Sequence, residues 1–275
     1  MRDLRVAAVS MRSETGEIEK NLERTAFYVS KAADMGADVI CFPELSITGY
    51  TLTNPTSLYG GLNPDEVTDR IVGLARDKGL LILSGGVAPS GLERPFIVQV
   101  VAGPDGLLGS YRKTHLSPAE RDIYAAGHEM GIFSHEKVTF GIQLCYESHF
   151  PELSTLMALR GVEVIFFPHA SPRGEPEEKM DSWMRHLPSR AFDNGLFVVA
   201  CNPVGETAAG LSFPGVALAL SPAGRVMEAY CGRLEKMVLV DLSREVLEET
   251  RNQRMKYFLP NRRPELYGDL SSGSA

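Results

Sequence analysis

The stretch 138-VTFGIQLCYESHFPE-152 decides the fold, because it carries an apolar strand directly into a polar turn. Val138–Leu144 is predicted as a strand that runs directly into Cys145, and Pro151–Arg160 follows as a helix. Cys145 stands where the strand ends. A side chain at such a junction can project out of the sheet, and unpaired N–H groups at a helix start favour an anion there. The stretch therefore predicts a strand-to-helix unit with a thiol at its turn.

Working outward, short runs rich in Val, Ile and Phe alternate with amphipathic stretches. Strands are predicted at Leu4–Ser10, Asp38–Phe42, Leu80–Val87, Pro95–Ala102, Leu107–Tyr111, Val162–Phe167, Leu196–Cys201, Gly215–Leu220, Val226–Tyr230 and Leu234–Leu242. Helices are predicted at Gly16–Met35, Pro64–Lys78, Pro176–Asn194 and Arg244–Asn252. Strand–helix alternation broken by hairpins favours an α/β fold with mixed sheets and outer helices. We expect one domain over 1–275, with an extended tail from about 259, and a functional loop at 112–131.

The composition narrows the classes of partner. With 28 basic and 35 acidic residues, the net charge is 28 − 35 = −7. An acidic surface repels phosphate backbones and anionic membranes, so neither nucleic acid nor membrane is expected. The short charged N-terminus does not resemble a secretory signal, which favours a cytoplasmic location. The four cysteines have no CxxC pair and are expected as free thiols.

Three polar residues could form one site with nucleophilic chemistry. Cys145 is either a nucleophile, with its thiolate favoured by the helix start, or a small buried apolar side chain. His149 is the nearest base, but a histidine so close in sequence more often packs or caps a helix. Glu44 ends an apolar strand, where poor solvation raises a carboxyl pKa towards neutrality and suits a general base. Lys113 ends another strand; beside a thiol it would stabilise an oxyanion, although many lysines there are solvated.

The residues also carry a family resemblance. Three motifs occur in order: Phe42–Leu45 (FPEL), Tyr111–Leu116 (YRKTHL) and Gly141–Glu147 (GIQLCYE). Together with later matches at Arg190-Ala191, Asn194, Asn202, Gly205 and Ser221–Gly224, they cover nearly the whole chain. The sequence resembles the nitrilase superfamily of carbon–nitrogen hydrolases. Each motif is weak alone, but three in order are highly specific.

The resemblance implies both a fold and a mechanism. The fold is a four-layer αββα sandwich, and subunits pair into a homodimer or larger assembly. Cys145 is implied as nucleophile, Glu44 as general base and Lys113 as electrostatic partner. Glu120 matches a second glutamate that positions the lysine and substrate, and the Tyr146 N–H is implied to hold the oxyanion. No cofactor or metal is needed, and the histidines show no zinc-like spacing.

The residues that follow Cys145 indicate which class of substrate to expect. Tyr146 and 150-FPE-152 lean to amidases, Glu147 leans slightly to nitrilases, and Ser148-His149 departs from both. We therefore expect a small amide substrate, with a nitrile or an N-carbamoyl compound as alternatives. A catalytically inactive interaction protein is a rival that the retained polar residues argue against. Arg173 could pair with a substrate carboxylate, or be a solvated loop residue. Trp183 could wall the pocket or belong to the core.

Overall fold

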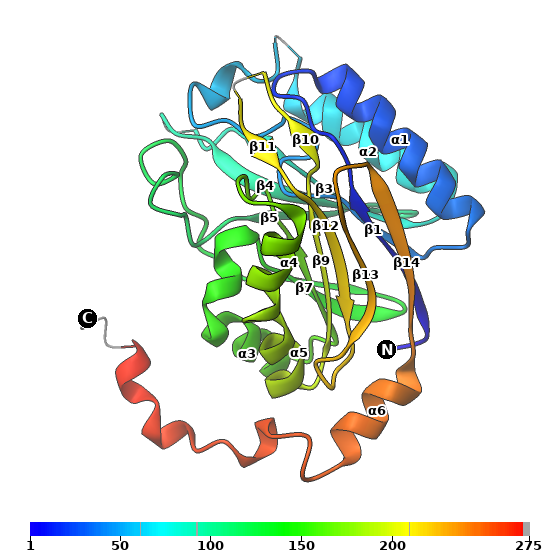
Figure 1. Ribbon diagram of the computed structural model, residues 1–275, viewed down its shortest axis with the longest axis vertical. Coiled ribbons are helices and arrows are strands. Elements are labelled where there is room, and N and C mark those ends of the chain that lie inside the picture. The colour runs from blue at the N-terminus through cyan, green and yellow to red at the C-terminus, as the bar shows by residue number, and fades with distance from the viewer. Residues whose placement is uncertain (61, 92, 209, 272–275) are drawn as a thin grey trace.

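The structure is a computed structural model that describes residues 1–60, 62–91, 93–208 and 210–271 (Figure 1). Two six-stranded sheets lie face to face at its centre. The first has the order β14-β1-β2-β3-β4-β5 and the second β13-β12-β9-β8-β7-β6. The strands of the first sheet are β1 (Leu4–Ser10), β2 (Val39–Cys41), β3 (Leu81–Ala88), β4 (Phe96–Gly103), β5 (Gly106–Arg112) and β14 (Lys236–Leu242). Those of the second are β6 (Gly131–His135), β7 (Val138–Ile142), β8 (Val164–Pro168), β9 (Phe197–Asn202), β12 (Gly215–Leu220) and β13 (Val226–Gly232).

The centre of each sheet is parallel and its flanks are antiparallel. β1, β2 and β3 run parallel in the first sheet, as β7, β8 and β9 do in the second. β8 (VIFFP) and β9 (FVVACN) are buried along their whole length. Such continuous apolar strands are expected where both faces of a sheet are covered. Their buried side chains leave only the strand ends available for a polar site.

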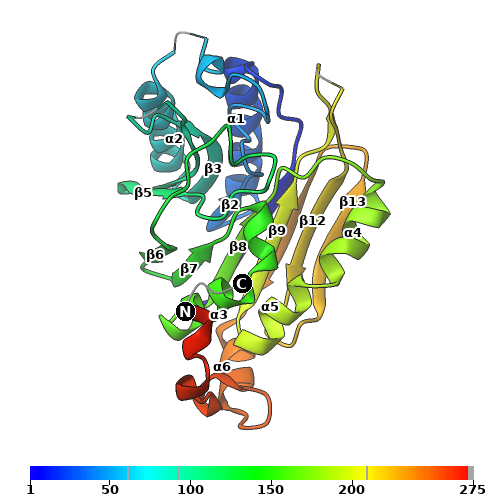
Figure 2. The same ribbon diagram turned by 90° about the vertical axis from the view of Figure 1, so that its left-hand side faces the viewer.

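Helices cover the outer face of each sheet (Figures 1 and 2). α1 (Ile18–Asp34) and α2 (Pro64–Lys78) pack apolar faces on the first sheet, in a core that includes Leu22, Val29 and Ile71. α3 (Pro151–Leu159), α4 (Pro176–Met184) and α5 (Leu187–Asn194) cover the second. A third core lies between the sheets. The predicted αββα sandwich is therefore confirmed.

Two details differ from the sequence prediction. The predicted helix Pro176–Asn194 is wrong as a single element, because it breaks at His186 into α4 and α5. Pro188 explains the break, since it lacks the N–H that would donate to the Met184 carbonyl in a continuous helix, and it is tolerated in the first turn of α5. The strand β6 was not predicted, because its mixed segment GIFSH lacks a continuous apolar run.

The C-terminal segment follows α6 (Arg244–Asn252) and passes beneath the helices of the second sheet (Figure 1). It contains the short 3-10 helices η3 (Leu259–Asn261), η4 (Pro264–Leu266) and η5 (Gly268–Ser271) rather than a purely extended chain. Positions 272–275 of the predicted tail lie outside the described residues. Among the described residues, none of the helices combines the length and apolar character needed to cross a membrane.

Candidate active site

The three predicted polar residues follow three different strands. Glu44 lies just after β2, and Lys113 directly follows β5. Cys145 begins the 3-10 helix η2 (Cys145–His149), and two residues separate it from the end of β7 (Val138–Ile142). Because β2 and β5 belong to the first sheet and β7 to the second, the site forms where the ends of the two sheets face each other. Sequence separation therefore gives little indication of how close these groups are.

The Lys113 ammonium joins two carboxylates. Its Nζ donates to Glu44 Oε1 at 2.8 Å and to both Glu120 carboxylate oxygens at 3.0 Å. All three side chains are almost fully buried, the most exposed being Glu120 at 3%. The second oxygen of Glu44 accepts the Ala170 N–H at 3.1 Å, and Glu120 Oε2 accepts the Ser117 N–H at 2.8 Å. Each ion is thus paired and hydrogen-bonded, as buried charges must be.

Burial controls the proton affinities of this cluster. It raises the pKa of Glu44 to about 7, opposed by the nearby Lys113 charge. Burial also works against the charged form of Lys113, but Glu44 and Glu120 outweigh it and hold the lysine pKa well above its usual value. The rise predicted for Glu44 is confirmed in direction. Near neutral pH, this carboxyl can therefore both accept and release a proton.

Cys145 adjoins the cluster in an unusual backbone conformation. Its φ is +43°, a region that non-glycine residues rarely adopt. Burial, with the charge of Glu44, raises the pKa of its thiol to about 12, despite the opposing effects of Lys113 and the Ala170 N–H. The prediction that the helix start favours the thiolate is therefore wrong for the free protein. Desolvation and a neighbouring carboxylate outweigh the short 3-10 helix.

Glu147 holds this arrangement together, a role that was not predicted from the sequence. It is fully buried, and its Oε1 accepts hydrogen bonds from the Tyr111 hydroxyl, the Thr114 N–H and hydroxyl, and the His115 N–H. Its Oε2 accepts the Leu144 N–H at 2.6 Å. Burial opposes its ionisation, yet these donors lower its pKa. Glu147 thereby ties the segment after Lys113 to the turn that carries Cys145. An acidic residue two positions after a candidate nucleophile was the available signal.

A close backbone approach positions the Glu44 loop. A Cβ at Gly85 of β3 would lie 2.3 Å from the Leu45 nitrogen and 2.8 Å from the Pro43 carbonyl oxygen. The Gly85 carbonyl accepts the Ile47 N–H at 2.8 Å. Only glycine fits this contact, so β3 fixes the loop on both sides of Glu44.

A pocket of about 210 Å³ opens beside Cys145. Its walls include Glu120, Tyr146 and Trp183. Trp183 is 2% exposed and its ring contacts His169, with centroids 4.4 Å apart, so the residue belongs both to the core and to the pocket wall. Arg173 does not line this pocket, and it is exposed in the loop before α4.

His149 lines the same pocket as Cys145. Its ring packs against those of Tyr146 and His186. Burial lowers the pKa of His149. Within the part of the chain that the structure describes, no hydrogen bond joins it to Cys145. This placement agrees with the choice of Glu44 over His149 as the candidate base.

Lys179 is a further charged residue of the pocket that sequence reasoning missed. It lies on α4, and its Nζ donates to the Ser171 hydroxyl at 2.7 Å. Nothing in the sequence around it, EPEEKMD, distinguishes it from a solvated helical lysine. Its place in the site depends on how α4 docks.

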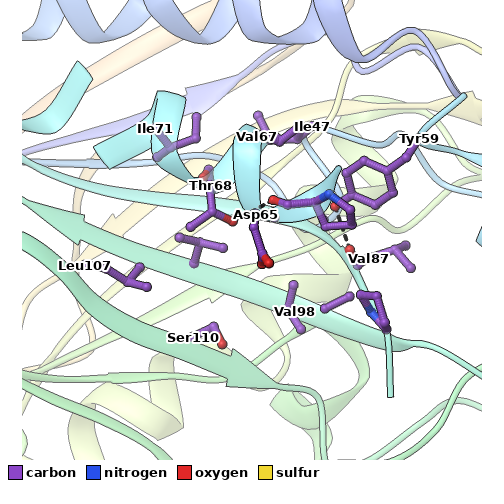
Figure 3. Close-up of a pocket in the computed structure, with 17 residues that line it drawn as sticks. Ile47, Tyr59, Asp65, Val67, Thr68, Ile71, Val87, Val98, Leu107 and Ser110 are labelled. Atoms are coloured by element: carbon purple, nitrogen blue, oxygen red, sulfur yellow. Dashed lines mark hydrogen bonds between the residues drawn. The ribbon is translucent and has the colours of Figure 1, made fainter. Parts of the chain in front are cut away.

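A second hollow, of about 180 Å³, lies between α2 and strands β3, β4 and β5 (Figure 3). Apolar side chains such as Val67, Ile71 and Val98 dominate its walls (Figure 3). None of Glu44, Lys113, Glu120 and Cys145 lines it. This hollow is a packing gap between α2 and the first sheet. The candidate nucleophile Cys145 and Glu120 line the other pocket instead.

Known proteins share this sequence pattern and this fold. The family model described as carbon–nitrogen hydrolase matches residues 5–252. A protein named nitrilase from Pyrococcus abyssi is 28% identical, covering 96% of this chain and 99% of the relative. An (R)-stereoselective amidase from a Pseudomonas species is 29% identical, covering 97% of this chain and 94% of the relative.

A solved structure adds a chemical comparison. It is a variant of an amidase from Nesterenkonia sp. AN1, with the acetamide moiety of fluoroacetamide added covalently at its active-site cysteine. Its TM-score is 0.81 at 25% identity, with 97% of this chain and 96% of that chain covered. The match in sequence over most of the chain, and in fold, assigns the protein: it belongs to the carbon–nitrogen hydrolase family, the enzymes that hydrolyse carbon–nitrogen bonds other than peptide bonds.

Proposed function

We propose that the protein is an amidase that hydrolyses a small amide through a thioester on Cys145, with release of ammonia. One observation carries the proposal. A buried lysine joins two buried carboxylates next to a thiol, and one of those carboxyls has a pKa of about 7. That combination provides a proton acceptor, a fixed positive charge and a nucleophile in one water-poor site.

In the first half of the reaction, Cys145 Sγ attacks the amide carbon while Glu44 takes the thiol proton. Because the thiol pKa of about 12 lies far above that of Glu44, proton transfer accompanies formation of the C–S bond. The Lys113 ammonium and the Tyr146 N–H stabilise the oxyanion of the tetrahedral intermediate. Protonated Glu44 gives its proton to the leaving nitrogen, and ammonia departs to leave an acyl thioester.

In the second half, water replaces ammonia. Glu44, again ionised, takes a proton from water as the oxygen attacks the thioester carbonyl. The second tetrahedral intermediate collapses, and Glu44 returns the proton to the departing Cys145 sulfur. The carboxylic acid product leaves. Glu120 holds Lys113 in position during both steps, since its carboxylate accepts two hydrogen bonds from the ammonium.

The main alternative within the family is hydrolysis of a nitrile to a carboxylic acid, with an N-carbamoyl compound as another substrate. The relative named nitrilase and the acidic residue at position 147 favour the nitrile reading. Tyr146 and the sequence Phe-Pro-Glu at 150–152 favour the amide. A non-catalytic interaction protein is disfavoured, because three buried ionisable groups are costly to retain without use.

An ammonia-release assay distinguishes these functions. The purified protein is incubated with small aliphatic amides, ω-amides of dicarboxylic acids, N-carbamoyl compounds and nitriles. We expect turnover of at least one amide, and turnover of nitriles alone would contradict the amidase assignment. Cys145→Ala should abolish turnover. Cys201→Ala, at a buried thiol of β9, should preserve it, and equal loss in both variants would contradict the role of Cys145.

Four free thiols support a reducing compartment, so we also propose a cytoplasmic location.

A further inference from the structure

The pocket at Cys145 has a positive charge on the wall formed by α4. Lys179 lies in the first half of this helix, where its N–H donates to the Glu175 carbonyl at 3.0 Å. Its side chain is half-buried, and its Nζ reaches the Ser171 hydroxyl. Within the described residues, no carboxylate forms an ion pair with this ammonium. Lys179 differs in this from Lys113, whose charge is balanced by Glu44 and Glu120.

The Ser171 hydroxyl is itself held in place. The Asn202 side chain, fully buried at the end of β9, accepts the Ser171 N–H at 2.8 Å and donates to the Ser171 carbonyl at 3.2 Å. The preceding residue, Ala170, donates its N–H to Glu44. One short segment therefore contacts the candidate base at one residue and the Lys179 ammonium at the next. This links the positive group to the reacting end of the pocket through a fixed backbone.

The partly buried position of Lys179 disfavours the charged form of its side chain. Burial lowers its pKa, and a partly desolvated ammonium is stabilised when an anion pairs with it. The other basic side chains on these walls are His149, His169 and His186, and burial lowers the pKa of each, to about 3 for His169 and about 4 for His186. Lys179 is thus the wall group most able to provide a positive charge at neutral pH.

We propose that Lys179, with the Ser171 hydroxyl, binds the carboxylate of an anionic substrate, a small primary amide that carries a carboxylate at its far end. This inference rests on the proposed amidase function and adds the substrate class. The amide group lies at Cys145, and the ammonium and the hydroxyl donate to the carboxylate. Glu44 and Glu120 would repel an anion that lacked such a partner. Arg173 has no part in this contact, since it lies outside the pocket lining.

The test compares substrates that differ only in charge. Glutaramate and succinamate are compared with the neutral diamides glutaramide and succinamide, which replace the carboxylate by a carboxamide of similar shape. Wild-type protein is expected to prefer the anionic member of each pair in kcat/KM. Lys179→Gln is expected to lose roughly 10- to 100-fold on the anionic amides, nearly all in KM, and little on the diamides. Lys179→Arg should retain part of the preference.

Matched controls separate the possible causes. Lys20→Gln makes the same change at an exposed lysine of α1, and it should leave both classes of substrate unaffected. An equal loss of kcat on charged and neutral amides in Lys179→Gln would overturn the inference, because it would mean that Lys179 acts on Cys145 or on the fold. A loss of anion preference in Arg173→Gln but not in Lys179→Gln would also overturn it.

The wild-type comparison tests the inference even if a Lys179 variant fails to fold. Equal kcat/KM on glutaramate and glutaramide would contradict carboxylate binding while leaving the amidase function intact. Absence of ammonia release from every amide, butyramide included, would contradict the proposed function itself. The two failures are therefore distinguishable in one set of assays.

Discussion

At the scale of single residues, the main chemical problem is the proton on Cys145. A thiol with a pKa of about 12 is protonated at neutral pH, so the reaction depends on a base that removes the proton during attack. Glu44, with a pKa of about 7, is suited to that role. Cys145 and Glu44 could be identified from the sequence as the candidate nucleophile and the candidate base. The raised thiol pKa could not, because it results from burial and from a carboxylate distant in the chain.

The proton affinity of Glu44 predicts the pH dependence of amide hydrolysis. A general base acts when ionised, and the pKa of Glu44 is raised, so kcat/KM should fall as the pH drops through about 7 and level off above it. Lys113 should not limit the alkaline side near its usual pKa, since its two carboxylates raise that value. Initial rates over a pH series provide the measurement. A plateau that extends unchanged to pH values far below 7 would contradict this role for Glu44.

Glu147 provides a second test at this scale. The Glu147 carboxylate accepts five hydrogen bonds. In Glu147→Gln, an NH₂ group replaces one of its two oxygens, and this group faces donors whose hydrogen bonds it cannot accept. Leaving buried donors unpaired should lower the free energy of unfolding by roughly 2–4 kcal/mol. Denaturant unfolding checks the value. Glu136→Gln, at an exposed residue in the turn between β6 and β7, is the matched control and should change stability little. Equal stability of both variants would contradict the positioning role of Glu147.

At the scale of elements, strand ends and loops determine the site. The chain from Pro64 to Lys78 has the bounds that the sequence predicted, because Asn63 caps its start and Gly79 its end. The break between α4 and α5 was missed although Pro188 was visible, because amphipathic spacing continues through it. Lys179 could not be assigned to the pocket for a related reason. Helical periodicity does not say which neighbour a helix contacts.

The contact between β3 and the Glu44 loop is testable with a glycine pair. Gly85→Ala places a Cβ against the backbone at Leu45 and Pro43, so the loop must shift. We expect a loss of about 2 kcal/mol in stability and of roughly 100-fold in kcat, because small displacements of reacting groups are costly. Gly73→Ala in α2, where nothing lies within 4 Å, should instead stabilise the protein by about 0.5–1 kcal/mol. Thermal unfolding and activity of both variants provide the comparison; unimpaired activity in Gly85→Ala would contradict the argument.

At the scale of the whole molecule, the order of layers could be predicted only through the family resemblance. Strand and helix patterns indicated mixed sheets with outer helices, but not that two sheets pair face to face, because that depends on contacts between distant strands. That the chain forms one domain over 1–275 stays a prediction. The expected homodimer likewise stays a prediction. One surface of the molecule indicates where the two subunits meet.

That surface is the outer side of α3 and α5. Leu156, Leu159 and Phe192 are 43%, 48% and 41% exposed, and Phe258 of the tail packs on Phe192 with ring centroids 5.5 Å apart. Helices α3 and α5 pack together, and exposed apolar side chains on neighbouring helices are typical of protein interfaces. We propose that a second copy covers this face.

Light scattering after size exclusion should therefore give the mass of a dimer or larger assembly. The double variant Leu159→Glu, Phe192→Glu should shift the mass to that of a monomer, because charges at a buried interface are unfavourable. Leu234→Glu, at a residue that is 77% exposed in the turn between β13 and β14, is the control and should leave the mass unchanged. A wild-type monomer would contradict the proposal.

The central claim is that Cys145 carries the acyl group during hydrolysis, and rapid acid quenching followed by peptide mass spectrometry tests it most directly. The protein is mixed with excess butyramide, quenched during the first turnovers and digested. We predict a butyryl adduct on the peptide that contains Cys145, absent from Cys145→Ala and present in Cys201→Ala. Turnover with the acyl group on another residue, or undiminished ammonia release by Cys145→Ala, would contradict the account.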